Sequence, residues 1–215
     1  MENNMRRIVL IDGENLTYGL RTLLADTQEQ TDGSNDKAPR SALNGFAFRA
    51  LIEDLLEDKI PSQVIWFGAR LRKYDQNEQI LLKSSAAIAL QSGFMNMLQK
   101  QHIQFVKVGY LRAREADACK ECGHTEWNLI EKGVDVGLAV RMLSEADKAT
   151  ELVVISADTD LLPAFKMARK MGARVMHVGY EYKPIAALSM NADSTRIITR
   201  PMAKKYKERR LDVDE

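Results

Sequence analysis

Four aspartates in this sequence follow, or lie close to, segments that we expect to be strands of one sheet. Asp12 closes the first apolar run, Asp158 and Asp160 follow a later one, and Asp135 lies between them near an expected helix start. Because the carboxyl ends of parallel strands meet at one edge of a sheet, we expect the four carboxylates to converge there. Clustered carboxylates repel one another unless a cation neutralises them. Mg²⁺ or Mn²⁺ held in this way could act on a phosphate group.

The rest of the chain alternates short apolar runs with amphipathic segments, and this pattern predicts an α/β fold with a mostly parallel central sheet. The expected strands occupy residues 7–11, 63–68, 103–108, 152–155, 174–178 and 196–199. The longest expected helix covers about 75–101, and another covers 134–146. Asp160 is expected to be the N-cap of a further helix that stops at Gly172.

We expect one domain over residues 1–200. It carries a polar, turn-rich loop at 27–41 and a polar, cysteine-containing insert at 113–131. Residues 201–215 are rich in charge and are expected to form a C-terminal tail.

The composition is that of an ordinary globular protein, with 45% hydrophobic and 28% charged residues. The sequence has no apolar run of about 18 residues, so no membrane span is expected. The N-terminus lacks the apolar stretch of a signal peptide, and two cysteines make no disulfide framework. We therefore expect a cytoplasmic protein, and the sequence leaves a homo-oligomer open.

Three segments resemble a known family. Ile-Asp-Gly-Glu-Asn-Leu (11–16), Glu-Lys-Gly-Val-Asp-Val (131–136) and Ile-Ser-Ala-Asp-Thr-Asp-Leu (155–161) are similar to the motifs of NYN-domain proteins. The nearest type is the LabA-like branch of the PIN-like nuclease superfamily. The resemblance covers about residues 7–199 and implies a PIN-like α/β/α sandwich.

The same resemblance implies hydrolysis of RNA phosphodiester bonds that depends on Mg²⁺ or Mn²⁺. By motif position, the catalytic, metal-binding set would be Asp12, Asp135, Asp158 and Asp160, with Asn15 beside them.

Several basic residues could contact the RNA backbone. Lys132 is implied by its place in the second motif, and others follow the second expected strand or lie at the basic C-terminal end. For these others, a solvated charged surface is an equal alternative. The candidates are Lys132, Arg70, Arg72, Lys73, Lys204 and Lys205.

The insert holds Cys119, Cys122 and His124 at a spacing that could bind structural zinc. Three ligands are one short of the usual four, so ordinary reduced cysteines are the alternative. The pair does not fit a zinc deaminase, because those enzymes have His-x-Glu upstream of Pro-Cys-x-x-Cys, and no His-x-Glu precedes the cysteines in this sequence.

The sequence thus predicts a metal-dependent ribonuclease. The alternative is a non-catalytic RNA-binding or regulatory protein that retains the PIN-like fold. A phosphatase of the haloacid dehalogenase type fits less well, since it requires Asp-x-Asp where this chain has Asp12-Gly-Glu14.

Overall fold

A computed structural model gives the fold of the protein. It describes residues 5–25, 37–57, 61–116, 122–123 and 125–209.

Seven strands form one sheet in the order β4-β3-β2-β1-β5-β6-β7. The strands are β1 (Arg6–Asp12), β2 (Gln63–Arg70), β3 (Gln104–Glu115), β4 (Trp127–Lys132), β5 (Thr150–Ile155), β6 (Arg174–Tyr180) and β7 (Ser194–Ile198). Neighbouring strands are parallel, except for the antiparallel pair β3 and β4 at one edge. The mostly parallel sheet expected from the sequence is therefore confirmed.

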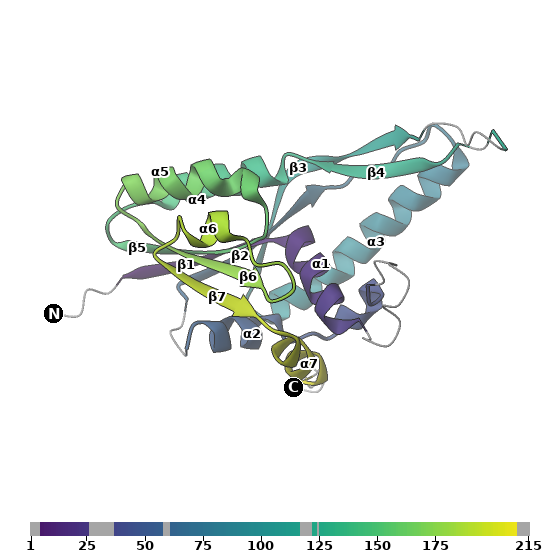
Figure 1. Ribbon diagram of the computed structural model, residues 1–215. Helices are drawn as coiled ribbons and strands as arrows, with labels where there is room; N and C mark the ends of the chain where they lie inside the picture. The colour runs from purple at the N-terminus through teal and green to yellow at the C-terminus, as the bar shows by residue number, and fades with distance from the viewer. Residues whose placement is uncertain (1–4, 26–36, 58–60, 117–121, 124, 210–215) are drawn as a thin grey trace.

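Helices cover both faces of this sheet (Figure 1). They are α1 (Gly13–Leu24), α2 (Phe48–Leu55), α3 (Glu78–Lys100), α4 (Val134–Glu145), α5 (Leu162–Lys170), α6 (Ala186–Ser189) and α7 (Arg200–Glu208), with short 3-10 helices η2 (Arg40–Leu43) and η3 (Thr159–Leu161). Helices α1, α2, α7 and the C-terminal part of α3 pack on one face, and α4, α5 and α6 pack on the other. The result is the expected α/β/α sandwich.

Strand β1 illustrates why this sequence forms a sheet covered on both sides. Val9 and Ile11 belong to the hydrophobic cluster under α1, Ile8 and Leu10 belong to the cluster under α4, and all four are fully buried. Successive side chains of a strand point to opposite faces, so a strand between two helical layers needs a continuous apolar run. That run ends at Asp12, where the strand reaches the edge of the sheet.

The two ends of the expected polar insert at 113–131 belong to the strands of a β-hairpin. Strand β3 continues to Glu115, and β4 returns from Trp127 in antiparallel pairing with it. The physical reason is alternation: Leu111 and Ala113 are half-buried, whereas Tyr110, Arg112 and Arg114 are exposed. Figure 1 shows that the hairpin projects beyond the rest of the sheet, with α3 alongside it.

The expected charged tail at 201–215 is wrong for its first part, because α7 continues to Glu208. The Thr199 side chain caps this helix by accepting a hydrogen bond from the Met202 N–H. Ala203 and Tyr206, three residues apart on one face, are buried in the cluster under α1 and α2. Residues 210–215 lie outside the described part of the chain.

The polar loop expected at 27–41 lies outside the described residues up to position 36. Its last two positions, Arg40 and Ser41, begin η2. The Arg40 guanidinium forms an ion pair of 2.6 Å with Glu14, so this end of the loop lies beside the start of α1.

Among the described residues, no helix is both long and apolar enough to span a membrane.

Candidate functional site

Asp12 is the last residue of β1 and also the N-cap of α1. Its Oδ1 accepts a hydrogen bond of 3.2 Å from the Asn15 backbone N–H. Its Oδ2 accepts one of 3.0 Å from the Ser156 hydroxyl, which follows β5. Asp12 is thus fixed between two adjacent strands, and each oxygen of its buried carboxylate accepts one hydrogen bond.

The glycine after Asp12 allows this sharp strand-to-helix transition. A Cβ on Gly13 would lie 2.1 Å from Trp66 Nε1 and 2.4 Å from the Phe67 carbonyl oxygen. Helix α1 therefore begins in contact with β2, and only glycine fits at that point.

The segment after β5 is held by side chains of both strands. The Asp158 N–H donates to the Ser156 hydroxyl oxygen at 3.1 Å, and the Ala157 N–H donates to Asn15 Oδ1 at 2.9 Å. Asp158 Oδ1 in turn accepts a hydrogen bond of 2.9 Å from the Asp160 N–H. Asp158 is therefore the cap of the short helix η3, and the expected capping role of Asp160 is wrong. Asn15 supports this loop from within the protein.

His177 also contacts the segment that follows β5. It is fully buried, with Nε2 2.9 Å from the Ser156 carbonyl oxygen and Nδ1 3.1 Å from the Ser189 hydroxyl. Burial lowers the pKa of this histidine, which favours the neutral ring. The sequence pattern gave no reason to connect His177 with the aspartates.

Strand β4 approaches the same edge from the opposite direction. Tyr110 of β3 pairs with Arg70 at the end of β2 and with Lys132 at the end of β4, so both strands end at one level. Gly133, with a φ of 76°, then turns the chain into α4. Asp135 follows in the first turn of that helix.

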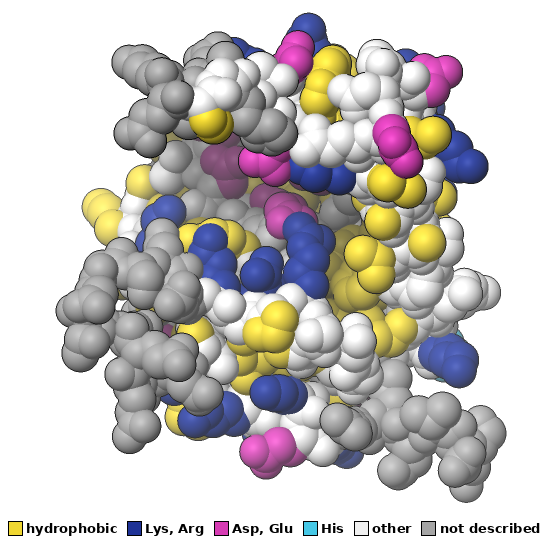
Figure 2. Space-filling model, turned by 90° about the vertical axis from the view of Figure 1, so that its right-hand side faces the viewer, with side chains coloured by type: hydrophobic (Ala, Val, Ile, Leu, Met, Phe, Trp, Pro, Cys, Tyr) yellow, Lys and Arg dark blue, Asp and Glu magenta, His cyan; other side chains and the backbone are white. Residues whose placement is uncertain are grey.

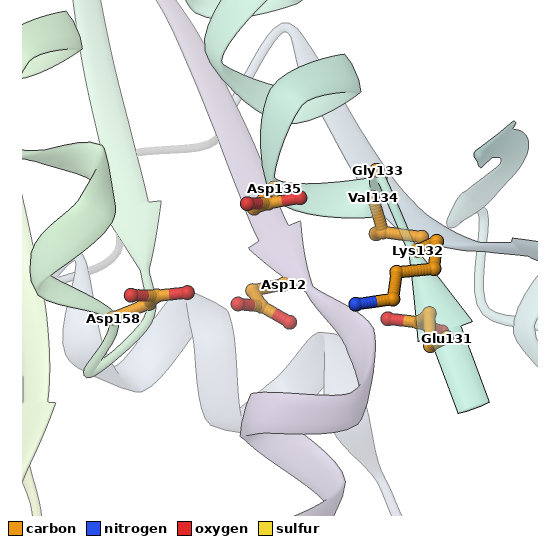
Figure 3. A pocket seen from close by; sticks show the side chains of 7 residues that line it. All are labelled: Asp12, Glu131, Lys132, Gly133, Val134, Asp135 and Asp158. Atoms are coloured by element: carbon orange, nitrogen blue, oxygen red, sulfur yellow. The ribbon is translucent and has the colours of Figure 1, made fainter.

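These segments enclose a pocket of about 260 Å³. Figure 3 shows that the carboxylates of Asp12, Asp135 and Asp158 point into one space, and that the Lys132 ammonium points toward Asp12 from the other side. The lining residues are Asp12, Glu131, Lys132, Gly133, Val134, Asp135 and Asp158.

A second, overlapping group contains Asp160. Asp135, Asp158 and Asp160 each offer one carboxylate oxygen, and these oxygens lie within 4.8 Å of one another. Hard divalent cations take oxygen ligands of this type. The donor set therefore fits Mg²⁺ or Mn²⁺, with Asp12 on the adjoining wall of the pocket.

Glu131 is an acidic member of this pocket that sequence reasoning missed. The pKa of Glu131 is raised to about 7, chiefly by burial and then by the nearby negative charges of Glu14, Asp12 and Asp135, while a hydrogen bond with the Ala69 backbone opposes the rise. The sequence did contain a signal, since Glu131 opens the second motif. It could not be placed because β4 was not predicted.

Asp12 experiences the same environment. Burial raises the pKa of its carboxyl group, and the charges of Asp158 and Glu14 add to the effect. The hydrogen bonds from Asn15 and Ser156 oppose it, because they stabilise the ionised form.

The basic residues expected to contact RNA are divided between two regions. Lys132 lines the pocket, and Arg70 is exposed at the end of β2. Lys73 is also exposed, whereas the Arg72 guanidinium lies over the ring of Tyr74, 4.7 Å from its centroid.

Lys204 and Lys205 lie on α7, outside the residues that line the pocket. Lys205 pairs with Asp54 of α2 at 3.3 Å. The structure therefore does not bring these two lysines to the acidic edge. Of the expected zinc ligands, Cys119 and His124 lie outside the described residues, and Cys122 is an exposed free cysteine.

Comparisons with known proteins agree with this architecture. The sequence model of the NYN domain matches residues 6–199. No curated protein matches the chain. A crystal structure of VPA0982, a protein of unknown function from Vibrio parahaemolyticus RIMD 2210633, is similar with a TM-score of 0.56 at 15% sequence identity. That match covers 92% of this chain and 95% of VPA0982, and it shows a shared fold. Since the NYN match spans most of the chain, the protein belongs to the NYN domain family, within the PIN-like nuclease superfamily.

Proposed function

We propose that this protein is a metal-dependent ribonuclease that hydrolyses RNA phosphodiester bonds. One observation carries the proposal: three aspartates from β1, the β5 loop and α4 line one pocket with Glu131 and Lys132. A protein gains no stability by gathering like charges in a half-buried pocket, so the arrangement favours a bound cation.

Asp135, Asp158 and Asp160 are the proposed primary ligands, because their oxygens are mutually closest. Asp12 and Glu131 complete the acidic wall on the side of β1 and β4. A bound Mg²⁺ or Mn²⁺ would supply Lewis acidity and a water molecule of lowered pKa at this place.

The remaining groups of the pocket are suited to hold the substrate phosphate. Within the described residues, the Lys132 ammonium forms no ion pair closer than 4.0 Å, although it points into an acidic pocket. It is therefore available for a phosphate oxygen. The N-terminus of α4, beside Asp135, adds a partial positive charge.

Ser156 and Asn15 act on the geometry of the site and not on the substrate. Ser156 fixes Asp12 relative to Asp158, and Asn15 holds the Ala157 backbone. We propose that they keep the carboxylates at the spacing that a cation requires, as supporting hydrogen bonds do around metal ligands generally.

A non-catalytic RNA-binding or regulatory protein is the second candidate. The basic residues near the pocket would serve either role. The acidic wall favours the nuclease over the non-catalytic protein, because carboxylates that face a phosphate weaken simple RNA binding.

The deciding experiment incubates labelled RNA and DNA with the purified protein in Mg²⁺, in Mn²⁺ and with chelator. We expect RNA cleavage that needs the metal and that Asp158→Asn abolishes. RNA binding without cleavage under every divalent ion would establish the non-catalytic alternative.

Finer assignments belong to the same proposal. We place the protein in the LabA-like branch on the strength of its three motifs, and we propose a cytoplasmic location; the sequence leaves a homo-oligomer open. Structural zinc at Cys119, Cys122 and His124 stays a prediction. Metal analysis of protein purified without chelators tests it, with Cys119→Ser as the variant expected to lose zinc.

A further inference from the structure

The projecting hairpin carries an exposed face with a distinct composition. Side chains opposite one another in β3 and β4 share a face of the sheet. On this face Tyr110 pairs with Lys132, Arg112 with Ile130, and Arg114 with Asn128. We call this face the hairpin strip: Tyr110, Arg112, Arg114, Asn128, Ile130 and Lys132. All of its members except Ile130 are exposed, and Tyr110 is 53% exposed.

The cations of the strip are not neutralised by neighbouring acids. Among the described residues, Arg112 and Arg114 form no ion pair, and neither does Arg70 beside Tyr110. Several arginines elsewhere on the surface are paired. For example, Arg169 pairs with Asp193 and Arg196 pairs with Glu57. The strip therefore presents uncompensated positive charge.

The strip is continuous with the acidic pocket. Lys132 belongs to both, and Tyr110 lies between Lys132 and Arg70 in one row across three strands. Figure 2 shows acidic side chains in a hollow of the molecule, with Lys and Arg side chains next to them. A polymer that passes out of the pocket at Lys132 would thus meet a tyrosine ring first and two arginines next.

We propose that the hairpin strip binds single-stranded nucleic acid and guides it into the pocket, with the Tyr110 ring stacking on a base and Arg112 and Arg114 contacting phosphates. This proposal rests on the proposed function for the identity of the pocket, but its own observations are those of the hairpin.

Charge and shape favour this occupant. A flat, exposed ring between cations is the combination that binds single strands, because every base offers a face for stacking and every linkage offers a phosphate. Arg112 and Arg114 are two residues apart on one strand, which separates them by about 7 Å along the hairpin. That separation allows the two guanidinium groups to contact successive phosphates of an extended strand.

The test measures binding in chelator, so that cleavage plays no part. Single-stranded RNA and DNA of about 4 and about 16 nucleotides are the probes. We expect Arg112→Ala/Arg114→Ala to weaken binding of the long RNA about tenfold and to reduce the salt slope of the logarithm of affinity by about 1.4, as for two lost phosphate contacts. The affinity for the short RNA should fall less, because a short RNA contacts fewer residues of the hairpin strip.

Tyr110 is tested separately from charge. Tyr110→Ala should weaken binding of the long RNA about fivefold or more, whereas Tyr110→Phe, which keeps the ring, should bind as the wild type does. The matched control is Lys148→Ala/Lys170→Ala, which removes two exposed cations that lie just before β5 and at the end of α5, outside the residues that line the pocket. It should leave both affinity and salt slope unchanged. Thermal unfolding of every variant checks that the fold is intact.

The outcomes separate this proposal from the nuclease proposal. If the strip variants lose RNA binding but the wild type never cleaves RNA, the strip stands and the catalytic assignment falls. If the wild type cleaves RNA and the strip variants bind the long RNA normally, the strip proposal is wrong and the nuclease stands. A preference of the strip for acidic protein over both RNA and DNA in competition would also overturn it. Equal effects on RNA and DNA would show that selection between them takes place in the pocket.

Discussion

The hydroxyl of Ser156 donates a hydrogen bond of 3.0 Å to Oδ2 of Asp12. The two residues are 144 positions apart in the chain, yet this bond joins the end of β1 to the segment that follows β5. The same hydroxyl oxygen accepts the Asp158 N–H, so one side chain positions two of the acidic groups.

Ser156→Ala should therefore weaken the metal site without removing a ligand. The pKa of Asp12 should rise further, because a hydrogen bond that stabilises its ionised form is lost. We expect a higher Mn²⁺ concentration for half-maximal RNA cleavage, and a loss of about 1–3 kcal/mol in the free energy of unfolding. Ser144→Ala is the control, since the exposed Ser144 hydroxyl only donates to its own helix. Unchanged metal dependence in Ser156→Ala would contradict the positioning role.

Asp158→Asn tests the central ligand. Asparagine keeps an Oδ1 that can accept the Asp160 N–H, so the cap of η3 should survive. RNA cleavage should fall by orders of magnitude, while the melting temperature without metal should hold or rise slightly, because repulsion is relieved. Added Mn²⁺ should raise the melting temperature of the wild type, as any ligand of the folded state does, but not that of the variant. Cleavage at the wild-type rate would place the site elsewhere or expose a contaminant.

Glu131 gives the metal-free protein a specific pH dependence. Its pKa is about 7 in the folded protein against an ordinary value of 4.5, so between these values the folded state holds a proton that the unfolded state has released. This contribution to stability is complete below pH 4.5 and is lost as the pH rises through 7. We expect Glu131→Gln to remove that loss when unfolding is measured in chelator between about pH 5 and about pH 8.

The lowered pKa of His177 acts in the opposite direction, since its contribution is lost as the pH falls through the ordinary value of 6.5. The wild type and Glu131→Gln both contain His177, so the difference between their free energies of unfolding at each pH reports the Glu131 carboxyl group alone. Parallel pH curves for the two proteins would show that the Glu131 pKa is not raised.

Gly13→Ala should disrupt the fold at the edge of the pocket. The added Cβ would lie 2.1 Å from Trp66 Nε1, and neither the buried indole nor the Phe67 backbone can move freely. We expect a loss of about 1–3 kcal/mol in stability. Gly93→Ala on α3 is the matched control, because a Cβ there meets nothing within 4 Å. It should be neutral or stabilising, since alanine favours a helix.

The sequence predicted the parts of the fold that depend on local pattern. Apolar runs such as that before Asp12 marked the buried strands, and the edge rule for parallel sheets placed Asp12 and Asp158 together. Glu131 and the hairpin strip were missed for one physical reason. Strand β4 is half-exposed and antiparallel, so its pattern is polar and its position depends on pairing with β3. Pairing between distant segments leaves little trace in local sequence.

The supporting hydrogen bonds were also invisible to sequence reasoning. The Ser156 hydroxyl can bond any nearby carboxylate, and only the register of β1 and β5 makes Asp12 its partner. Asp160 is of a residue type that often caps helices. Asp158 is the residue that caps η3, because its Oδ1 accepts a hydrogen bond from the Asp160 N–H. Both residues are aspartates and have the same propensity to cap a helix, so only the path of the backbone decides which of them does so.

The bond between Ser156 and Asp12 also determines when the pocket can exist. Strand β1 is synthesised first, whereas Asp158 follows after nearly three quarters of the chain. A chain still on the ribosome and shorter than this has Asp12, Glu131 and Asp135 at most, without the loop that completes the acidic wall. Contacts of such long sequence separation also form late in folding, because closing the long intervening loop costs entropy. We therefore expect that an unfinished chain lacks the proposed ribonuclease activity. It would then cleave neither the messenger RNA nor the ribosomal RNA that surround it.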